Sequence, residues 1–399
     1  MTPAADRRDP DVGPAVSVIV PTYQRREYVL RAVRSVLAQT FADFELIVVD
    51  DGSTDGTDEA LAGLDPRLHY HWQENRGPGP ARNAGIALAR GEIVAFLDSD
   101  NRWLPRHLTV ITDVLERHPE AILVSTCFQF RPHGNDSAER AELVDLLPRL
   151  LLGNQVGYVS CIAVRRPALA AVGGFDERLP VSEDSDLWLR LAMHGPFCLI
   201  RCRTLIHQTT GGGLKERGLR SGEYLRLMEV SANRALRELE GVHRPDAREL
   251  ADRARAKLSL LTAMRALAGG AEAHARGSLE EACALLPDLS HDPSLVIGVV
   301  NQSARDPRDV VDIYASVASL WPAPRSDTAL YLRALATVVA LRTRRWREAA
   351  RLAGDRGFLA RPGFAIRTLP ITNSRVRRWI YGRFHSGQET AGAGEPPPP

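Results

Sequence analysis

Residues 44–56 read Phe-Glu-Leu-Ile-Val-Val-Asp-Asp-Gly-Ser-Thr-Asp-Gly, a run of apolar and β-branched residues that stops at two adjacent aspartates. Such a run, ended by Asp, Gly and Ser, is typical of a buried β-strand that leads into a turn. A similar run at residues 16–20 precedes it, and the apolar residues from Val29 to Leu37 between the two runs recur at helical spacing. Strand, helix and strand in this order predict a parallel pair of strands covered by a helix.

The alternation of strands and helices continues to about residue 210. We expect strands at 16–20, 44–49, 68–72, 93–97 and 121–128, and a helix at 80–90 before the fourth strand. The chain is therefore predicted to be of the α/β class, with a mostly parallel sheet flanked by helices. Such sheets bind ligands at the carboxyl ends of their strands, so the residues that follow each strand are the candidate site residues.

Beyond about residue 220 the strand signal ends, and apolar residues recur at helical spacing in residues 224–239, 250–267, 329–341 and 346–353. With 399 residues the chain is also longer than a single core usually supports. We expect a flexible leader (1–14), an α/β domain (15–215), an all-α domain (216–385) and a disordered Pro-rich tail (386–399). The helical half has no fixed period, so hairpins of the tetratricopeptide kind remain one option among several.

The charges nearly balance, with 51 basic and 49 acidic residues, so no overall positive field draws the chain to nucleic acid. The five cysteines are odd in number and form no C-x-x-C pair, which is typical of a reducing compartment. No apolar run suits a signal peptide or a membrane span, so we expect a cytoplasmic protein. Residues 375–384, Arg-Val-Arg-Arg-Trp-Ile-Tyr-Gly-Arg-Phe, fit either a solvated helix end or peripheral contact with the anionic inner face of a membrane.

Polar residues gather where the predicted strands end. Pro-Thr-Tyr follows the first strand (residues 21–23), Asp51 follows the second, and Leu-Asp-Ser-Asp-Asn follows the fourth (97–101). Hydroxyl and acidic groups at such places can hold the imide edge and the ribose of a nucleotide. Two carboxylates one residue apart, Asp98 and Asp100, can also bind a divalent cation that neutralises a diphosphate. Each piece alone equally fits a tight turn, in which Asp, Gly and Ser serve the backbone.

A third polar segment is Gly-Gly-Phe-Asp-Glu (173–177), followed by Ser-Glu-Asp (182–184). Ser182 is a typical residue for the start of a helix, and acidic residues in a first turn are favoured by the helix dipole. Residues 187–191 are strongly apolar apart from Arg190. Such apolar turns would hold a first-turn carboxylate rigidly at the edge of a cleft.

Taken together, five segments resemble the family 2 glycosyltransferases, which have the GT-A fold: V-S-V-I-V-P-T-Y, F-E-L-I-V-V-D-D-G-S-T-D, N-R-G-P-G-P-A-R-N-A-G, G-E-I-V-A-F-L-D-S-D and E-D-S-D-L-W-L-R. They occur in the family's order and at its usual spacing, over about residues 15–210. The resemblance implies an inverting enzyme that moves a sugar from a nucleotide diphosphate, in most members a UDP-sugar, to an acceptor hydroxyl. The chain lacks the Q-x-x-R-W signature of the family's membrane-embedded polymerases, which favours transfer of one or a few sugars.

The resemblance also implies roles for individual residues. A divalent cation, Mg²⁺ or Mn²⁺, would be held by Asp100 and Asp98, with His207 in the position of a histidine that serves the metal or the diphosphate. The segment around His207 lacks the family's usual tyrosine, and a lone histidine is as often structural. Asp184 would be the general base, with Glu183 as the other candidate. The nucleotide-sugar pocket would comprise Pro21, Thr22, Tyr23, Asp51, Arg82 and Asp98.

The acceptor is left open, because a glycan, a lipid-linked sugar, a small molecule or a peptide would each suit the family. Two alternatives to catalysis also stay open: a domain that binds nucleotide sugar without turnover, and a scaffold in which the helical half is the principal part. The Gly-rich segment 207–215 would serve either as a lid over the donor or as a linker to the helical domain.

Overall fold

The computed structural model describes residues 13–126, 141–151, 156–200, 202, 204–208, 223–241, 244–292, 294–303, 307–323 and 326–342. The chain divides into two compact units, Met1–Leu150 with Asn154–Leu214, and Leu151–Gly153 with Lys215–Pro399. Several expected segments lie outside the described residues: most of the leader, the tail, the segment 209–215, the helix at 346–353 and the segment 375–384.

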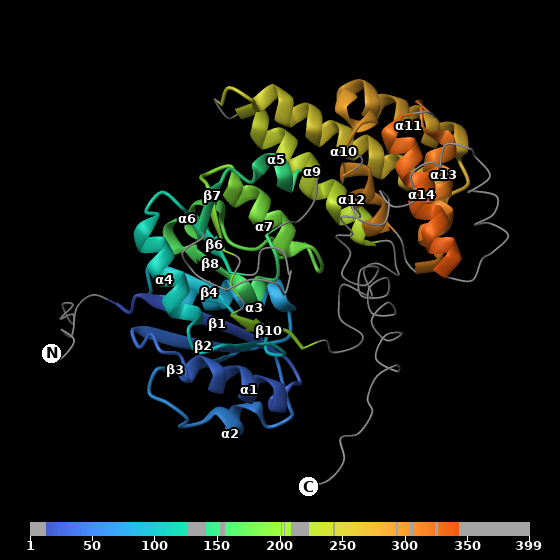
Figure 1. Ribbon diagram of the computed structural model, residues 1–399. Helices are drawn as coiled ribbons and strands as arrows, with labels where there is room; N and C mark the ends of the chain where they lie inside the picture. Colours follow the sequence, from blue (N-terminus) through green and yellow to red (C-terminus); the bar gives the residue numbers. More distant parts are fainter. Residues whose placement is uncertain are drawn as a thin grey trace, which may run out of the picture. The chain divides into compact units, whose positions relative to one another are not determined.

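The first unit is built on eight strands: β1 Val16–Thr22, β2 Phe44–Asp50, β3 Leu68–Trp72, β4 Ile93–Phe96, β6 Leu123–Ser125, β7 Ala141–Val144, β8 Ile162–Arg165 and β9 Phe197–Ile200. They form one sheet with the order β3-β2-β1-β4-β8-β6-β9-β7 (Figure 1). The half with β1 to β4 is parallel throughout. β8 runs antiparallel to β4 and β6, whereas β9 is parallel to β6 and antiparallel to β7. The predicted α/β class is confirmed.

The strands expected from the sequence are present, with shifted ends. β1 continues through Pro21 and Thr22, beyond its expected end, and β6 is shorter than the expected strand. Proline is tolerated in β1 because the pairing with β4 covers only residues 16–19, so beyond Ile19 the strand pairs on one side, with β2. The pattern does not predict β7, β8 or β9. The short strands β7 (Ala-Glu-Leu-Val) and β8 (Ile-Ala-Val-Arg) each contain a charged residue, and β9 (Phe-Cys-Leu-Ile) is a short apolar run that periodicity cannot assign to a strand or a helix.

Helices cover both faces of this sheet (Figure 1). On one face, α1 (Arg26–Leu37) and α4 (His107–Arg117) share a core with alternate residues of β1 and β2, such as Val18 and Val48. On the other face lies α3 (Pro78–Leu88), in which a Cβ atom at Gly85 would come within 2.5 Å of Ile19 Cγ2. Glycine therefore permits the close approach of α3 to β1 that aligns the start of this helix with the strand ends.

A second, two-stranded sheet links distant parts of the first unit. β5 (Arg102–Trp103) pairs antiparallel with β10 (Leu205–Ile206). This pairing places the residues that follow β4 beside the residues that precede His207. The remaining helices of the first unit are α2 Thr57–Leu61, α5 Leu147–Leu150, the short η2 Val159–Cys161, α6 Arg166–Val172 and α7 Glu183–Ala192.

The second unit is helical in the part that the structure describes. Its helices are α9 Glu223–Gly241, α10 Ala247–Ala268, α11 Glu272–Leu285, η3 Pro287–Ser290, α12 Ser294–Ser303, α13 Pro307–Leu320 and α14 Asp327–Arg342. α10 packs against α9 and α11, and α13 packs against α14. The helices expected at 224–239, 250–267 and 329–341 are confirmed as α9, α10 and α14. The pattern misses α12 because its residues 295–300 are apolar without a helical period.

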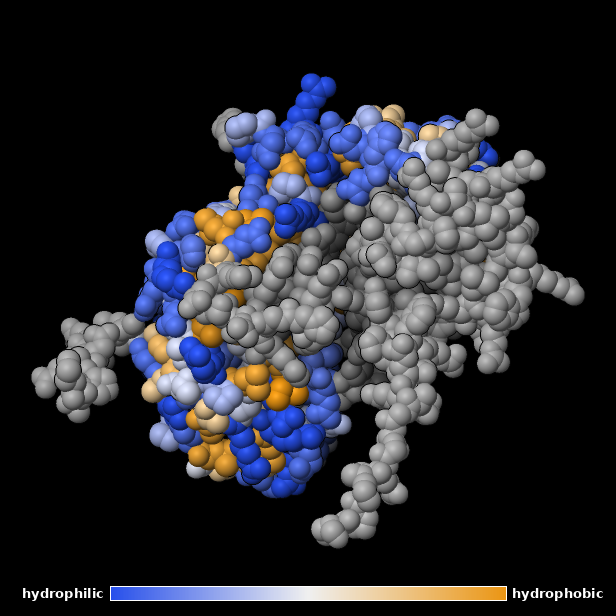
Figure 2. All heavy atoms as spheres, in the orientation of Figure 1, coloured by the Kyte–Doolittle hydropathy of each residue, from blue (hydrophilic) through white to orange (hydrophobic). Residues whose placement is uncertain are grey.

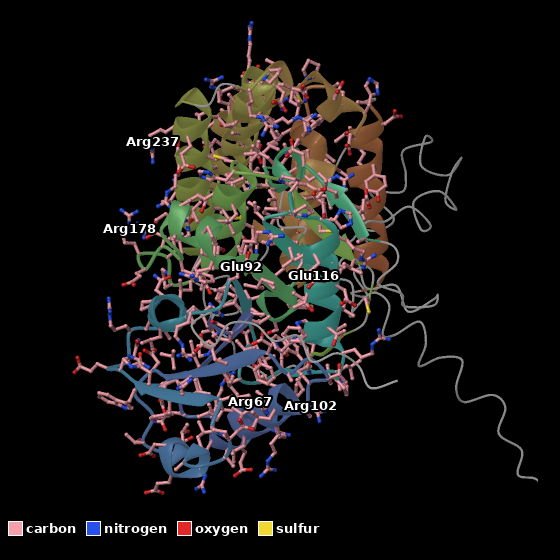
Figure 3. All side chains as sticks on the ribbon, turned by 90° about the vertical axis from the view of Figure 1, so that its left-hand side faces the viewer. Arg67, Glu92, Arg102, Glu116, Arg178 and Arg237 are labelled. Carbon is pink, nitrogen blue, oxygen red and sulfur yellow. The ribbon has the colours of Figure 1, made fainter. Side chains whose placement is uncertain are left out.

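The surface of the described residues is mixed in character. Arg178 and Arg237 project away from the ribbon (Figure 3). On the face drawn in Figure 2, apolar atoms form small areas separated by hydrophilic residues. Among the helices of the described residues, none combines the length and the apolar character that crossing a membrane requires.

A lysine inside the second unit lowers the stability of the folded state. Lys257 in α10 is only 7% exposed, and burial lowers the pKa of its amine to about 8. The unfolded chain binds this proton more tightly, so stability falls as the pH drops from the ordinary lysine pKa towards 8. We expect Lys257→Met to raise the free energy of unfolding at pH 7 by up to about 3 kcal/mol, measured by urea unfolding.

The gain from Lys257→Met should shrink as the pH rises from 8 towards 10. A matched control is Arg255→Met in the same helix, whose side chain is 42% exposed. This change should alter the free energy of unfolding by less than about 0.5 kcal/mol at either pH. A gain at Lys257 that is the same at pH 7 and pH 10 would show that packing, and not the buried amine, is responsible.

Candidate functional site

The carboxyl ends of the parallel strands bring the predicted site segments together. In the register of β1 and β2, Thr22 lies beside Asp50, and the Leu97 amide donates a hydrogen bond to the backbone of β1. Thr22, Asp51 and Asp98 therefore lie in or directly after neighbouring strands at one edge of the sheet. This is the edge at which parallel sheets bind ligands.

Asp51 is almost wholly buried, with 4% exposed, and holds the loop that leads into α3. Its Oδ1 accepts hydrogen bonds from Gln73 Nε2 (2.7 Å) and the Arg76 amide (2.9 Å), and its Oδ2 accepts one from the Gly77 amide (2.7 Å). Asp51 thus shapes the predicted nucleotide pocket through the loop 73–77. A bound base that contacts Asp51 would have to share these oxygens with the loop.

The turn after β1 is exposed and strained. Tyr23 is 47% exposed, and Gln24 has a left-handed φ of 51°. The Gln24 amide donates to Ser53 Oγ (2.8 Å), and its side chain donates to Thr54 Oγ1 (3.0 Å). The buried Thr22 hydroxyl has no hydrogen-bond partner among the described residues. A left-handed backbone outside glycine costs about 1–3 kcal/mol and is concentrated at functional sites.

Arg82, the fifth residue of α3, joins two of the predicted site segments. Its guanidinium donates to Asp98 Oδ1 and to Glu183 Oε1, each at 2.9 Å, and lies 5.3 Å from the centre of the Phe175 ring. Arg82 is only 6% exposed, and a charge buried this deeply needs such partners. Burial raises the pKa of the Glu183 carboxyl, and the charge of Arg82 opposes that rise. The sequence predicts that Arg82 contacts the nucleotide. In the structure, its guanidinium N–H groups donate to the carboxylates of Asp98 and Glu183.

The segment after β4 is held from two sides. On one side, Arg25 NH1 donates to Asp100 Oδ2 at 2.8 Å. On the other side, Ser160 Oγ accepts hydrogen bonds from the Asp98 amide (3.0 Å) and from Asn101 Nδ2 (2.9 Å). The two carboxylates expected to bind metal, Asp98 and Asp100, are therefore each paired with an arginine.

His207 lies beside the same segment. Asn101 Oδ1 accepts hydrogen bonds from His207 Nδ1 (2.9 Å) and the Gln208 amide (3.2 Å), and the Tyr158 ring stacks on the imidazole with centres 4.4 Å apart. Because Asn101 Nδ2 donates to Ser160, its oxygen faces the histidine, and Nδ1 must carry the proton. In this tautomer, Nε2 is the nitrogen through which the imidazole would bind a metal.

α7 begins directly after Ser182, as the sequence predicts, but the serine side chain does not cap the helix. Ser182 has a left-handed φ of 64°. Asp184 Oδ1 accepts hydrogen bonds from the Ser185 amide (2.6 Å) and hydroxyl (3.2 Å). The Glu183 side chain, in contrast, is paired with Arg82 and is 12% exposed. The two candidate bases therefore have different surroundings.

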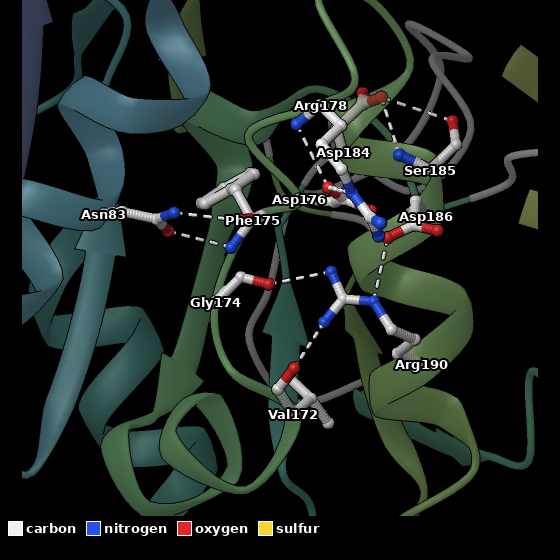
Figure 4. A network of polar contacts seen from close by, with 10 residues as sticks. All are labelled: Asn83, Val172, Gly174, Phe175, Asp176, Arg178, Asp184, Ser185, Asp186 and Arg190. Carbon is white, nitrogen blue, oxygen red and sulfur yellow. Dashed lines mark hydrogen bonds and ion pairs between the residues drawn. The ribbon is translucent and has the colours of Figure 1, made fainter.

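The loop between α6 and α7 is fastened to both α3 and α7 (Figure 4). Asn83 in α3 exchanges two hydrogen bonds with the backbone of Phe175, at 2.9 and 2.8 Å. Arg190 in α7 donates to the carbonyl of Val172, the last residue of α6, and to that of Gly174 in the loop, at 2.7 Å each. A Cβ atom at Gly174, which has a φ of 70°, would lie 2.6 Å from Asn83 Oδ1, so this position requires glycine. These contacts hold the first turn of α7, with Asp184, in a fixed place relative to α3.

No group of three His, Cys, Asp or Glu side chains is placed to hold a metal ion among the residues that the structure describes. The expected set of Asp98, Asp100 and His207 is therefore not a closed site made by protein alone, and His207 joins the segment through Asn101. One or two carboxylates do suit Mg²⁺ or Mn²⁺ shared with a diphosphate, because such hard cations keep water and phosphate oxygens as ligands.

Three residues that build the site were not singled out by the sequence reasoning. Asn83 and Asn101 lie in or beside motifs whose other residues are the predicted site residues. Only this position in the sequence pointed to a role for the two asparagines. Ser160 follows no motif and is 62 positions from the Asp98 amide that it binds. Its role is visible only when β8 is placed beside β4.

Part of the first unit is similar in sequence to known proteins. Residues 17–171 match the family model described as Glycosyl transferase family 2. An uncharacterized glycosyltransferase of Nostoc sp. is 44% identical over 105 residues, which are 25% of this chain and 33% of the relative. One of Rickettsia typhi is 28% identical over 220 residues (51% and 68%). The succinoglycan biosynthesis protein ExoO of Rhizobium meliloti is 34% identical over 215 residues (50% and 61%). The chain thus spans about a third of the first relative's length.

Among solved structures, S. aureus TarS 1-349 in complex with UDP-GlcNAc aligns with a TM-score of 0.49 and 18% identity, covering 86% of this chain and 92% of that chain. The sequence matches and the motifs at the strand ends indicate a glycosyltransferase domain. Residues 17–171 of this chain are similar to glycosyltransferase family 2.

Proposed function

We propose that the first unit transfers a sugar from a nucleotide diphosphate sugar to an acceptor hydroxyl with inversion, and that Asp184 is the general base. The observation that carries the proposal is the position of Arg82, whose guanidinium is 2.9 Å from both Asp98 and Glu183. The segment with Asp98 and Asp100, which suits a diphosphate, and the start of α7 therefore border the same space. A donor whose diphosphate is held by Asp98 and Asp100 would present its anomeric carbon to the start of α7.

The surroundings of the two carboxylates favour Asp184 over Glu183 as the base. Glu183 is engaged by Arg82 and almost buried. Asp184 accepts hydrogen bonds only from its neighbour Ser185 among the described residues. A base must reach the acceptor hydroxyl and take its proton while the diphosphate leaves from the opposite face of the sugar. That geometry inverts the configuration at the anomeric carbon.

The donor set at Asp98 and Asp100 supports a requirement for Mg²⁺ or Mn²⁺, with His207 Nε2 as an additional ligand of the metal or of the diphosphate. When bound, the cation would offset charge on the departing diphosphate. Arg25 and Arg82 hold the two carboxylates in place until then. The exposed ring of Tyr23, with Pro21, Thr22 and Asp51 around it, would receive the base and ribose of a UDP-sugar.

We further propose a saccharide hydroxyl as the acceptor. The name of one relative, a succinoglycan biosynthesis protein, supports this choice. The alternative is a domain that binds nucleotide sugar without transferring it. Removing the proposed base by Asp184→Asn distinguishes an enzyme, which should lose turnover, from such a binding domain.

Metal-dependent donor binding tests the proposal directly. Thermal unfolding would be measured with UDP, GDP and their sugars, in the presence of Mn²⁺ or EDTA, on the wild type and Asp100→Ala. We expect at least one nucleotide sugar, at a hundredfold excess over its Kd, to raise the wild-type Tm by about 5 °C with Mn²⁺ only.

The Asp100→Ala variant should lose this shift. A matched control is Asp113→Ala, which changes an exposed aspartate of α4 and should keep the shift. Equal shifts in Asp100→Ala and the wild type would remove Asp100 from the metal site. A wild type that no nucleotide or nucleotide sugar stabilises would contradict the proposed function.

A further inference from the structure

Ser182 combines two features that each cost free energy: a left-handed backbone and a buried hydroxyl without a hydrogen-bond partner among the described residues. Among the described residues, only Gln24 and Ser182 have positive φ without being glycine. A serine before a helix usually adopts an extended backbone, from which its oxygen accepts a hydrogen bond from the first turn. In the left-handed conformation Ser182 makes no such cap.

The Ser182 hydroxyl is also unpaired. It is buried, with 8% of the residue exposed, and has no hydrogen-bond partner among the described residues. A buried polar atom without a partner is rare in folded proteins and requires an explanation. Ser182 therefore has a strained backbone and an unused hydroxyl, and it lies beside the candidate base Asp184. This combination is expected where a bound ligand supplies the missing hydrogen-bond partner.

Other unpaired polar atoms lie on the elements that form the same site. Thr22 Oγ1 at the end of β1, Arg82 Nε in α3 and Trp188 Nε1 in α7 are buried without partners among the described residues. The guanidinium of Arg82 joins α3 to the start of α7 and to the segment after β4. A ligand bound there would find unused polar atoms on α3 and α7 nearby.

The charges near Ser182 indicate which part of a donor would lie there. The two carboxyl groups that directly follow Ser182, those of Glu183 and Asp184, outnumber the single guanidinium of Arg82, which Glu183 shares with Asp98. This excess of negative charge disfavours a diphosphate next to Ser182. The hydroxyl groups of a sugar are neutral, and each of them both donates and accepts a hydrogen bond, as the serine hydroxyl does.

We propose that Ser182 binds a hydroxyl group of the sugar that is transferred, and so helps to select the donor sugar. The inference rests on the proposed function and extends it to a residue with no assigned role. The contact would lie between the diphosphate, near Asp98 and Asp100, and the base Asp184. A site built to hydrogen-bond a substrate hydroxyl discriminates strongly against sugars that lack it.

The test compares two variants that lose the hydroxyl but differ in the backbone. Ser182→Gly relieves the left-handed strain, whereas Ser182→Ala keeps it. Binding of UDP-glucose, UDP-galactose, UDP-N-acetylglucosamine and GDP-mannose, and of UDP and GDP, would be measured by calorimetry with Mn²⁺. For the sugar that binds the wild type, we expect both variants to raise Kd about tenfold, which is about 1.4 kcal/mol. The Kd of the matching diphosphate should change less than twofold.

Each other outcome overturns the inference in a recognisable way. An unchanged Kd for the nucleotide sugar in both variants would mean that the hydroxyl contacts no sugar. An equal loss for the diphosphate would place Ser182 in the nucleotide pocket, and a loss in only one variant would assign the effect to the backbone. If no nucleotide sugar binds the wild type, the proposed function itself fails, and the inference falls with it.

Discussion

Asp184→Asn is expected to reduce kcat by about 10²–10⁴-fold, because asparagine keeps the shape of the side chain but cannot take the proton of the acceptor hydroxyl. The donor Kd should change less than about twofold, since Asp184 contacts Ser185 and not the residues around the diphosphate. Steady-state transfer assays and calorimetry with the same nucleotide sugar would measure the two quantities. A large loss in kcat at constant donor affinity is the signature of a lost base.

The control for Asp184→Asn is Glu183→Gln. The glutamine carbonyl can still accept the hydrogen bond that Arg82 donates at 2.9 Å, so kcat should fall less than about tenfold. The comparison also separates the two candidates. If Glu183→Gln abolishes transfer and Asp184→Asn leaves it nearly intact, then Glu183 is the base and Asp184 has a lesser role.

Arg82→Met is expected to destabilise the first unit by about 3–5 kcal/mol at pH 8, because it leaves the buried Glu183 carboxylate without its ion-pair partner. The loss should be smaller at pH 5. Burial raises the pKa of the Glu183 carboxyl, and without Arg82 the rise is unopposed, so the folded variant can bind a proton at low pH and avoid the buried charge. Urea unfolding at the two pH values would measure this difference.

A double variant tests whether the unpaired charge of Glu183 causes the loss of stability in Arg82→Met. Arg82→Met combined with Glu183→Gln removes both charges of the pair, so it should recover much of the stability at pH 8 and lose the pH dependence. It should not recover donor binding, because Asp98 would still lack its partner. If the single variant is equally unstable at pH 5 and pH 8, then lost packing against Phe175 outweighs the unpaired charge.

The sequence predicts well those features that depend on local patterns. β1, β2 and β4 are recognised because each contains an apolar, β-branched run that ends at turn residues, and β3 because its apolar residues alternate with histidines. The parallel arrangement of these strands follows from the helices between them. α1, α3, α9 and α10 are recognised because their apolar residues recur with a helical period. β7, β8 and β9 escape because each is short and has no pattern that separates a strand from a helix, and α12 escapes because its apolar run has no period.

By itself, the sequence determined the class of the fold and the motifs that stand at the strand ends, since both depend on residues close together in the chain. Tertiary structure alone decided how those motifs meet. Arg82 reaches Glu183 across 101 positions, and His207 reaches Asn101 across 106, in contacts that exist only once the sheets are assembled. Long-range charge pairing decides that Glu183 is engaged by Arg82, whereas Asp184, the proposed base, is not. No local pattern encodes it, because the energy of a buried charge is set by the partners that the fold brings to it.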